Sequence, residues 1–344
     1  MEDSSRQTRS QLMQLFAQQE LKPRHDLGQN FLVDLNLHDL IVRHAKLSTA
    51  DVVLEIGTGT GGLTTRLADA AGHVVSVEYD AHVFGHAQRL LGGRANVTLI
   101  HGDALENKNT LNPMVLDAVR GALEQIQRQE TQGLPSLGFG EDVDNPWRLR
   151  AKETTLKLVA NLPYNVATPV ISNLVASDLP WSRMVVTIQW ELAQRMLAKP
   201  GTADYSALTV WMQAQSRLQI VRKLPPSVFW PPPKVDSAVL LVERDFEAQS
   251  KIADRAFFHD FIRDVFTQRR KKLVGVLTNL CAEKRPRDSH PWASSEFALS
   301  REQLEQLLHD CNIPLEARAE QLPVATLVEF TNRLTEPRPL SAHH

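Results

Sequence analysis

A strand that runs directly into a glycine-rich loop constrains the fold of this chain more than any other feature. Residues 51–56, DVVLEI, are typical of a buried strand, and GTGTGG follows at once before the helical stretch LTTRLADAA. A strand, a tight loop and a helix in this order open a βαβ unit. The same alternation continues and predicts an α/β fold with a parallel sheet. The further predicted strands are 73–80, 96–103, 155–162, 183–190, 218–224 and 236–245, the last two as a closing pair.

Three parts of the chain differ in pattern. Residues 1–20 are polar and Gln-rich and are expected to form a loosely held helix or a tail, whereas 21–246 carry the alternating strands and helices. Within that domain, about 107–150 are interpreted as an insertion, because this connection is much longer than usual and contains GLPSLGFGEDVDNP. The pattern NPMVLDAVRGALEQIQRQ predicts that part of this insertion is helical and the rest mobile. Residues 251–336 are helical in pattern and predict a small all-helical C-terminal domain.

The bulk composition is that of an ordinary globular protein. Of 344 residues, 42% are hydrophobic and 23% are charged. The two cysteines are too few for a disulfide framework and lack metal-ligand spacing, so we expect no metal site and a cytoplasmic setting. No apolar run is long enough to cross a bilayer and no signal sequence is evident, so we expect no membrane association.

One run concentrates positive charge in a chain whose net charge is only −2. The run is FTQRRKK at 266–272, on a predicted helix, and its candidate phosphate contacts are Arg269, Arg270, Lys271 and Lys272. The alternative is a solvated helical face with no ligand. The slight net acidity argues weakly against a nucleic-acid partner, so the local distribution of charge carries this hypothesis.

The glycine-rich loop fits two cofactor patterns. Gly57, Gly59 and Gly62 satisfy the dinucleotide pattern G-x-G-x-x-G. Glu55, Gly57, Gly59 and Gly61 satisfy the acid-x-G-x-G-x-G pattern of S-adenosylmethionine enzymes. Glycines let the backbone turn sharply and approach a ligand closely. A glycine-rich turn without any ligand is the third possibility.

Two acids at strand ends add to this loop. Glu78 ends the second predicted strand, where a carboxylate accepts hydrogen bonds from the ribose hydroxyls of either cofactor. Asp103 ends the third strand, where a carboxylate can hold an adenine amino group, which favours S-adenosylmethionine over NAD. The alternative for each is a solvated carboxylate at a strand end.

The stretch NLPY ends the next strand on the side of the sheet where ligands bind. An amide oxygen from Asn161 and the carbonyl of Leu162, stiffened by Pro163, could accept hydrogen bonds from an adenine N6 amino group. Its lone pair would then point at a sulfonium methyl. Tyr164 could stack on the base, a contact of about 1–3 kcal/mol. The alternative is a β-turn with the tyrosine as a core lid.

These motifs together resemble the KsgA/RsmA-type family of ribosomal RNA small-subunit adenine dimethyltransferases. The resemblance runs from about residue 22 to the C-terminal helices. The matching motifs are KPRHDLGQNFL, EIGTGTGGLT, VEYD, GDAL, NLPYN, LPPSVFWPPPKVDSAV and FTQRRKKL. It implies a Rossmann-like, class I methyltransferase sheet and dimethylation of two adjacent adenosines near the 3′ end of 16S rRNA. It also implies that the enzyme acts on the 30S subunit during its biogenesis, and we expect a monomer.

The resemblance also implies roles for individual residues. Asn30 and Leu32 would fold over the S-adenosylmethionine, beside Gly57 and Gly59. Glu78 would bind its ribose, Asp103 its adenine, and Asn161 would lie between its methyl group and the substrate. Tyr164 and Phe229 would sandwich the target adenine, which must leave the RNA stack. From its sequence context alone, Phe229 is equally an apolar plug in a Pro-rich loop.

Two departures and three other functions stay open. Thr58 replaces the usual Pro of the glycine loop, and Trp190 replaces a common Lys, which puts RNA affinity in doubt. A 23S rRNA adenine-N6 methyltransferase shares the core motifs, although the PPSVFWPPPKVDSAV block favours the small-subunit enzyme. A non-catalytic nucleic-acid-binding relative is disfavoured by the intact NLPY. A NAD-dependent dehydrogenase lacks a suitable acid/base pair.

Overall fold

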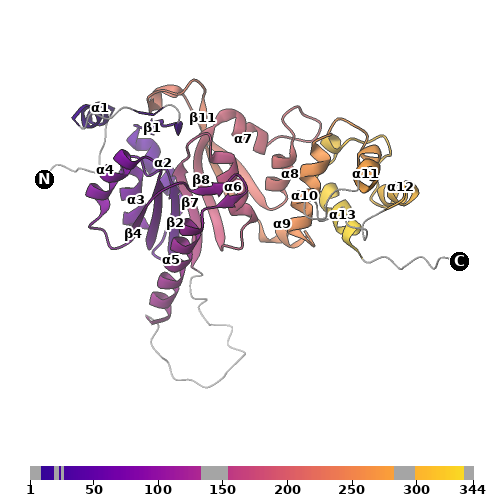
Figure 1. The fold of residues 1–344 in the computed structure, drawn as a ribbon, viewed down its shortest axis with the longest axis horizontal. Coiled ribbons are helices and arrows are strands. Elements are labelled where there is room, and N and C mark those ends of the chain that lie inside the picture. The colour runs from indigo at the N-terminus through magenta and orange to yellow at the C-terminus, as the bar shows by residue number, and fades with distance from the viewer. Residues whose placement is uncertain (1–8, 19–22, 25–26, 133–153, 283–298, 337–344) are drawn as a thin grey trace, which may run out of the picture. The chain divides into compact units, whose positions relative to one another are not determined.

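The chain forms two compact units. The computed structural model describes residues 9–18, 23–24, 27–132, 154–282 and 299–336. The first unit comprises Met1–Ala193 with Gln219–Glu243, and the second comprises Gln194–Leu218 with Arg244–His344 (Figure 1). Each unit is described by itself below. The stretch GLPSLGFGEDVDNP and residues 1–8 lie outside the described residues.

The first unit is built on a seven-stranded sheet in the order β4-β3-β2-β7-β8-β11-β9. Neighbours from β4 to β8 pair in parallel, and β11 pairs antiparallel with β8. The predicted α/β fold with a parallel sheet is therefore confirmed. The strands are β2 (Asp51–Ile56), β3 (His73–Glu78), β4 (Val97–His101), β7 (Thr155–Asn161), β8 (Trp181–Gln189), β9 (Ser216–Leu224) and β11 (Ser237–Arg244).

The strand order reverses between β2 and β7, and this positions the helices. The chain moves from β2 outward to β4 and then returns to β7. Because parallel crossovers are right-handed, helices before and after the return cover opposite faces of the sheet. The helices of this unit are α1 (Arg9–Gln18), α2 (Leu35–Ala45), α3 (Gly62–Ala70), α4 (Ala81–Leu91), α5 (Pro113–Gln132), α6 (Ala167–Ala176) and the start of α7 (Trp190–Met196).

One face of the sheet carries a continuous apolar core. Leu37 and Ile41 from α2 and Leu67 from α3 join Val53 and Val159 from the central strands in one buried cluster. Asp34 caps α2, because its side chain accepts the N–H of Asn36. The helix α2 therefore begins directly after the N-terminal segment that reaches the carboxyl edge of the sheet.

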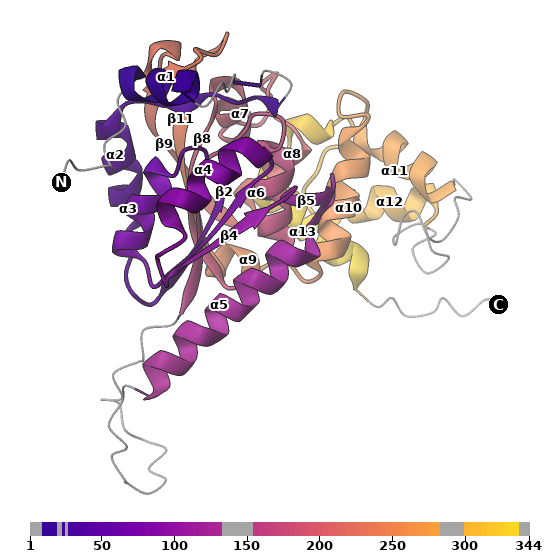
Figure 2. The same cartoon turned by 60° about the vertical axis from the view of Figure 1, so that its left-hand side comes forward.

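The helix α5 covers β2 and β3 and belongs to the fold itself. Its buried residues are Val115, Val119, Ala122 and Ile126. Its C-terminal turns extend beyond the strands in both views (Figures 1 and 2). The stretch interpreted as an insertion, about 107–150, thus includes a helix that the sheet needs for its second face. The helical pattern NPMVLDAVRGALEQIQRQ predicts this helix, although the pattern alone does not show that the helix packs on the sheet. Before it, β5 (Leu105–Asn107) and β6 (Thr110–Leu111) form a short hairpin.

The N-terminal helix α1 packs on the domain through apolar side chains. Leu12 and Phe16 are buried, whereas the sequence predicted a loosely held helix or a tail. Phe16 contacts the rings of Phe31 and Trp230 edge-on, with centroids 5.1 and 5.0 Å away. Phe31 and Trp230 are themselves partners in the strand pair β1 (Phe31–Leu32) and β10 (Phe229–Trp230).

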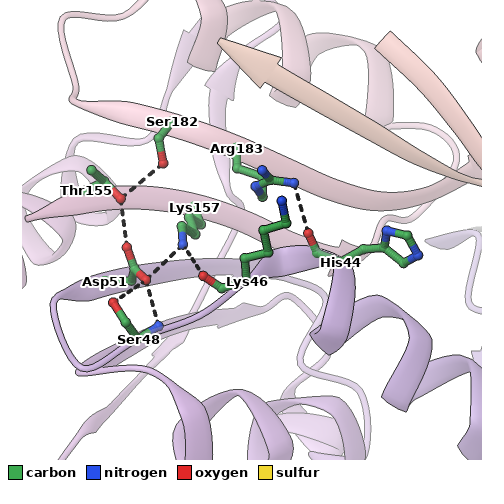
Figure 3. Close-up of polar contacts among 8 residues, drawn as sticks. All are labelled: His44, Lys46, Ser48, Asp51, Thr155, Lys157, Ser182 and Arg183. Carbon is green, nitrogen blue, oxygen red and sulfur yellow. Dashed lines mark hydrogen bonds and ion pairs between the residues drawn. The ribbon is translucent and has the colours of Figure 1, made fainter. Parts of the chain in front are cut away.

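The amino ends of the central strands are joined by a buried ion pair (Figure 3). Lys157 Nζ lies 2.8 Å from Asp51 Oδ2 and also donates to the carbonyl of Lys46. Asp51 accepts further hydrogen bonds from Ser48 and from the Thr155 hydroxyl. Every carboxylate oxygen of Asp51 thus has a partner, which a buried charge requires. The network ties β2, β7 and the loop after α2 together at the edge away from the glycine loop.

The second unit is mostly helical. Besides residues of α7 and β9, it contains α8 (Ala207–Gln213), α9 (Phe246–Ser250), α10 (Arg255–Phe266), α11 (Leu273–Ala282), α12 (Arg301–Asp310) and α13 (Val324–Thr335). The predicted sheet domain, 21–246, included 194–218, but this stretch belongs to the helical unit. The reason is packing, since Trp211 lies against Phe258 and the hydroxyl of Tyr205 donates to the carbonyl of Leu322.

The basic run does not lie on a helix, as the sequence predicted. The helix α10 ends at Phe266 and α11 begins at Leu273, so Arg269, Arg270, Lys271 and Lys272 form the turn between them. The Leu273 N–H donates to the carbonyl of Ala317, which draws the chain out of the helical path. Arg269 also donates to the carbonyls of Tyr205 and Ala203, so several tertiary contacts hold these residues in a turn.

Candidate active site

A cavity of about 300 Å³ lies at the carboxyl ends of β2, β3, β4 and β7 in the first unit. This is the edge where ligands bind in open α/β sheets, beside the reversal of strand order. Its lining comes mainly from 27–32, 55–60, 77–79, 102–104 and 161–166, with Leu12, His38, Gly62 and Leu63. The N-terminal segment, the glycine loop and the NLPY stretch therefore meet around one space.

The glycines of the loop are required by their backbone angles. Gly57 has φ +86°, and a Cβ there would meet Pro163 at 3.4 Å. Gly59 has φ +56°, and its Cβ would meet the ring of Phe31 at 3.4 Å. Both backbone angles favour glycine over residues with a side chain. The loop thus passes directly between the NLPY stretch and the N-terminal segment.

Glu55 is buried beneath the loop. Its Oε2 accepts hydrogen bonds from the hydroxyls of Thr64 and Ser76, both at 2.6 Å. The Ser76 oxygen also lies 2.6 Å from the hydroxyl of Thr58. Burial raises the pKa of Glu55 to about 8 despite these hydrogen bonds. Its other oxygen, Oε1, is buried without a partner in the part of the chain that the structure describes.

The two predicted strand-end acids both lie on the cavity wall. Glu78 accepts the N–H of Gly59 through Oε2 and that of Asp80 through Oε1, each at 2.9 Å. Burial raises the pKa of Glu78, although these hydrogen bonds oppose the change. Asp103 is exposed and accepts the N–H of Leu105. Glu78 therefore stabilises the glycine loop and the turn after β3, Asp103 stabilises the turn after β4, and both line the cavity.

Asn161 is fixed by the N-terminal segment. Its Nδ2 donates to the carbonyl of Asn30 at 2.8 Å, across 131 residues of sequence. Asn30 in turn donates through its own side chain to the carbonyl of Gly28. Because the Nδ2 group of Asn161 faces the carbonyl of Asn30, its Oδ1 points away from that carbonyl. The segment and the end of β7 therefore orient one another.

The rest of the NLPY stretch is both a turn and a cavity wall. The side chain of Leu162 is buried, and its N–H donates to the carbonyl of Thr187. The carbonyl of Pro163 accepts the N–H of Val166, which closes the turn into α6. Tyr164 is half-buried, and its hydroxyl lies 2.6 Å from the Ser237 hydroxyl. The stretch therefore forms a turn whose residues also line the cavity.

Phe229 is not on the cavity wall, contrary to its predicted role in sandwiching the adenine. Its side chain is 1% exposed and belongs to the buried cluster with Leu32 and Leu224. Side chains alternate across a strand, so Trp230 faces the opposite way, toward Phe16. In this conformation Phe229 is the apolar plug that its sequence context also allowed.

Several cavity residues were not among the predicted site residues. Tyr79 is 55% exposed and follows Glu78 on the wall, and His38 and Thr58 also contribute. The position of Tyr79 directly after a strand-end acid could have indicated it. Nothing in the local pattern separates His38 from the other buried positions of α2.

Trp190 lies next to this edge of the sheet, at the start of α7. The backbone N–H of Trp190 donates to the backbone carbonyl of Asp236. The ammonium of Lys223 lies 4.9 Å from the centre of its ring and 2.7 Å from the Asp236 carboxylate. Lys223 on β9 thus places a positive charge against the face of the Trp190 ring.

No group of three or more His, Cys, Asp or Glu side chains among the described residues is arranged to hold a metal ion. Among the helices described, none combines the length and apolar character needed to span a membrane.

Comparison with known proteins identifies consistent relatives. A family model described as ribosomal RNA adenine dimethylase matches residues 20–325. The ribosomal RNA small subunit methyltransferase A of Moorella thermoacetica is 36% identical over 277 residues, covering 80% of this chain and 86% of that protein. The protein of the same name from a Geobacillus strain is 32% identical over 311 residues, covering 90% and 91%.

Solved structures share the fold. A dimethyladenosine transferase from Plasmodium falciparum superposes with a TM-score of 0.61 at 22% identity, covering 88% of this chain and 97% of that one. The 23S rRNA methyltransferase ErmE gives 0.56 at 21% identity, covering 89% and 100%. At these identities the likeness concerns the fold alone.

Proposed function

Because the chain belongs to the ribosomal RNA adenine dimethylase family, we propose that it dimethylates the N6 amino groups of two adjacent adenosines near the 3′ end of 16S rRNA. The methyl donor is S-adenosylmethionine and the substrate is the 30S subunit. The enzyme contributes to small-subunit biogenesis and acts as a monomer in the cytoplasm. The names of the relatives, each a small subunit methyltransferase, support the choice of ribosomal RNA.

The cavity fits S-adenosylmethionine. It combines a glycine loop with positive φ angles, two acids at strand ends and an exposed aromatic ring at Tyr79. Glu78 would hold the ribose, and Asp103 would hold the adenine. The rest of the cofactor would be surrounded by Asn30, Leu32, Gly57 and Gly59. Bound there, the cofactor supplies an electrophilic sulfonium methyl group. The buried and unpartnered Oε1 of Glu55 also points to a polar ligand group in this space.

The observation that carries the mechanism is the anchored amide of Asn161. Its Nδ2 is engaged by Asn30, so its Oδ1 is available as an acceptor. Together with the Leu162 carbonyl, this oxygen would accept the two N6 hydrogens of an adenine. Positive charge develops on that nitrogen as it attacks, and preorganised acceptors stabilise it. The stiff ring of Pro163 limits the backbone freedom next to the Leu162 carbonyl.

Tyr164 completes the substrate side of the proposal. Its hydroxyl is fixed by Ser237, which holds the ring in one orientation on the cavity wall. Burial raises the pKa of Tyr164, so the ring is neutral and suited to stacking on a base. Phe229 is buried in this conformation, so it would contact the adenine only after a movement of β10. The exposed Arg270, Lys271 and Lys272 of the second unit would contact phosphates.

A direct assay tests the proposal. The protein is incubated with S-adenosylmethionine labelled in the methyl group and with ribosomal subunits from cells that lack the modification. Label on two adjacent adenosines near the 3′ end of 16S rRNA is expected. Label in 23S rRNA would instead favour the function of ErmE, whose fold this chain shares. The absence of label from both RNAs would leave only a non-catalytic binder.

A further inference from the structure

His38 is a buried polar side chain that the proposed mechanism does not use. It lies on α2 and is 7% exposed, and its ring contributes to the wall of the cavity. Its Nδ1 is buried without a hydrogen-bond partner among the residues that the structure describes. The other buried positions of α2 are Leu37, Ile41 and Ala45, so the imidazole interrupts an apolar face.

An imidazole nitrogen without a hydrogen-bond partner at a buried position lowers the free energy of unfolding. Burial, and then the nearby Arg66, lower the pKa of His38 to about 4, so the ring is uncharged at neutral pH. A neutral imidazole still carries one N–H donor and one acceptor nitrogen. Leaving a buried donor or acceptor unpaired opposes folding, and such unpaired groups are rare in folded proteins. An apolar residue at this position would avoid the cost.

The position of His38 along the cavity identifies which part of a ligand it would meet. Glu78, Tyr79 and Asp103 lie at the ends of β3 and β4, on one side of the glycine loop. His38 and Leu63 line the cavity from α2 and α3 on the other side. A cofactor with its adenosine over β3 and β4 therefore directs its amino-acid end toward His38.

The surroundings favour the carboxylate of that amino-acid end. Arg66 is the charged side chain with the largest effect on His38, while Asp39 and Asp34 act more weakly in the opposite direction. The amino end of α3, at Gly62, adds the partial positive charge of a helix terminus. The ammonium of the same end would suit Glu55, whose Oε1 is an unpartnered acceptor when ionised.

We propose that the His38 imidazole donates a hydrogen bond to the carboxylate at the amino-acid end of the cofactor. The inference rests on the proposed function, because it assumes that an S-adenosylmethionine-type molecule fills the cavity. It assigns His38 a binding role, whereas Asn161 acts on the substrate. The site recognises a carboxylate, so it distinguishes ligands that carry the amino-acid end from those that lack it.

Calorimetric binding of two nucleosides tests the assignment. S-Adenosylhomocysteine carries the amino-acid end, and 5′-methylthioadenosine lacks it. The substitution His38→Leu removes the donor and is expected to weaken S-adenosylhomocysteine about tenfold or more, as for a hydrogen bond to a charged group. Binding of 5′-methylthioadenosine should stay within about twofold. His38→Gln keeps an N–H donor and should retain most of the affinity, which guards against a folding defect in the first variant.

A second buried histidine provides the control. His73 on β3 lies outside the cavity, and its Nε2 is 2.8 Å from the Thr98 hydroxyl. His73→Leu should leave the ratio of the two affinities unchanged. Equal weakening of both nucleosides by His38→Leu, or no weakening of either, overturns the assignment alone. If the unaltered protein binds neither nucleoside, the proposed function fails and the assignment with it.

Discussion

The side-chain amide of Asn161 donates to the backbone carbonyl of Asn30 at 2.8 Å. This hydrogen bond joins the end of a central strand to the N-terminal segment, so the side-chain amide of Asn161 is oriented before any ligand arrives. Preorganised dipoles of this kind are most effective when they need no reorganisation during reaction. The contact therefore connects the fold of the segment with the chemistry proposed at β7.

We expect Asn161→Ala to bind S-adenosylhomocysteine nearly normally and to transfer methyl groups about 10²–10³-fold more slowly, the usual cost of removing one such stabilising group. Asn161→Asp keeps an acceptor but cannot donate to Asn30, and it should also be slow. Single-turnover methylation of 30S subunits and calorimetric binding separate the two effects. Asn173→Ala, on α6, is the matched control and should leave both quantities unchanged. Methylation at the normal rate by Asn161→Ala would refute the catalytic role.

The buried carboxyl of Glu55 predicts a pH dependence of stability. Burial raises its pKa from an ordinary value of 4.5 to about 8 in the folded protein. Between these values the folded protein holds a proton that the unfolded chain has lost. The contribution of Glu55 to the free energy of unfolding therefore falls as the pH rises through this window and is constant above it.

Glu55→Gln should remove this contribution, because glutamine stays neutral. The melting temperature of the variant relative to the unaltered protein should rise steadily between about pH 5 and pH 8. Thermal melts of the ligand-free proteins across this range provide the measurement. Glu247→Gln, at an exposed position of α9, is the control and should give a parallel curve. A parallel curve for Glu55→Gln as well would contradict the prediction.

Local pattern predicted the sheet well. The strand β2 has the predicted limits, and β3, β4 and β7 differ from theirs by one or two residues at their ends. Apolar runs bounded by glycine, asparagine or charge determine these strands without distant contacts. The positions of Glu78, Asp103 and Asn161 on one cavity follow from the same fact, since carboxyl ends of parallel strands share an edge.

Features that depend on distant partners could not be predicted in this way. Phe229 is buried because β10 pairs with β1, and the sequence does not show that pairing. The end of α10 before the basic run depends on the contact between Leu273 and Ala317. His38 lies on the cavity only because α2 packs against α3 and the central strands. In each case a residue's neighbours come from elsewhere in the chain.

Two residues of the basic turn are expected to differ in role, one in stability and the other in RNA binding. Arg269 donates to the carbonyls of Tyr205 and Ala203 and lies 3.5 Å from Glu320, so it stabilises the helical unit. Lys271 is exposed. We expect Arg269→Ala to lower the melting temperature. Lys271→Ala should leave it unchanged, weaken binding to 16S rRNA and reduce the slope of log affinity against log salt by about one.

Binding titrations at several salt concentrations, with melts of both variants, provide this measurement. Lys251→Ala, an exposed lysine on a different surface element of the same unit, serves as the control and should alter neither the salt slope nor the affinity. An unchanged salt slope for Lys271→Ala would show that the turn does not contact phosphate.

The buried pair of Lys157 and Asp51 should stabilise the sheet only while both partners are present (Figure 3). Lys157→Met leaves a buried carboxylate without its cation, and breaking such a pair typically costs about 3–5 kcal/mol. Asp51→Asn leaves a buried ammonium and should also destabilise. The double variant should be less destabilised than the two single variants added together, because neither charge remains. Urea unfolding of the four proteins measures this coupling. Additive effects would show that the hydrogen bonds from Ser48 and Thr155, and not the ion pair, hold these strand ends together.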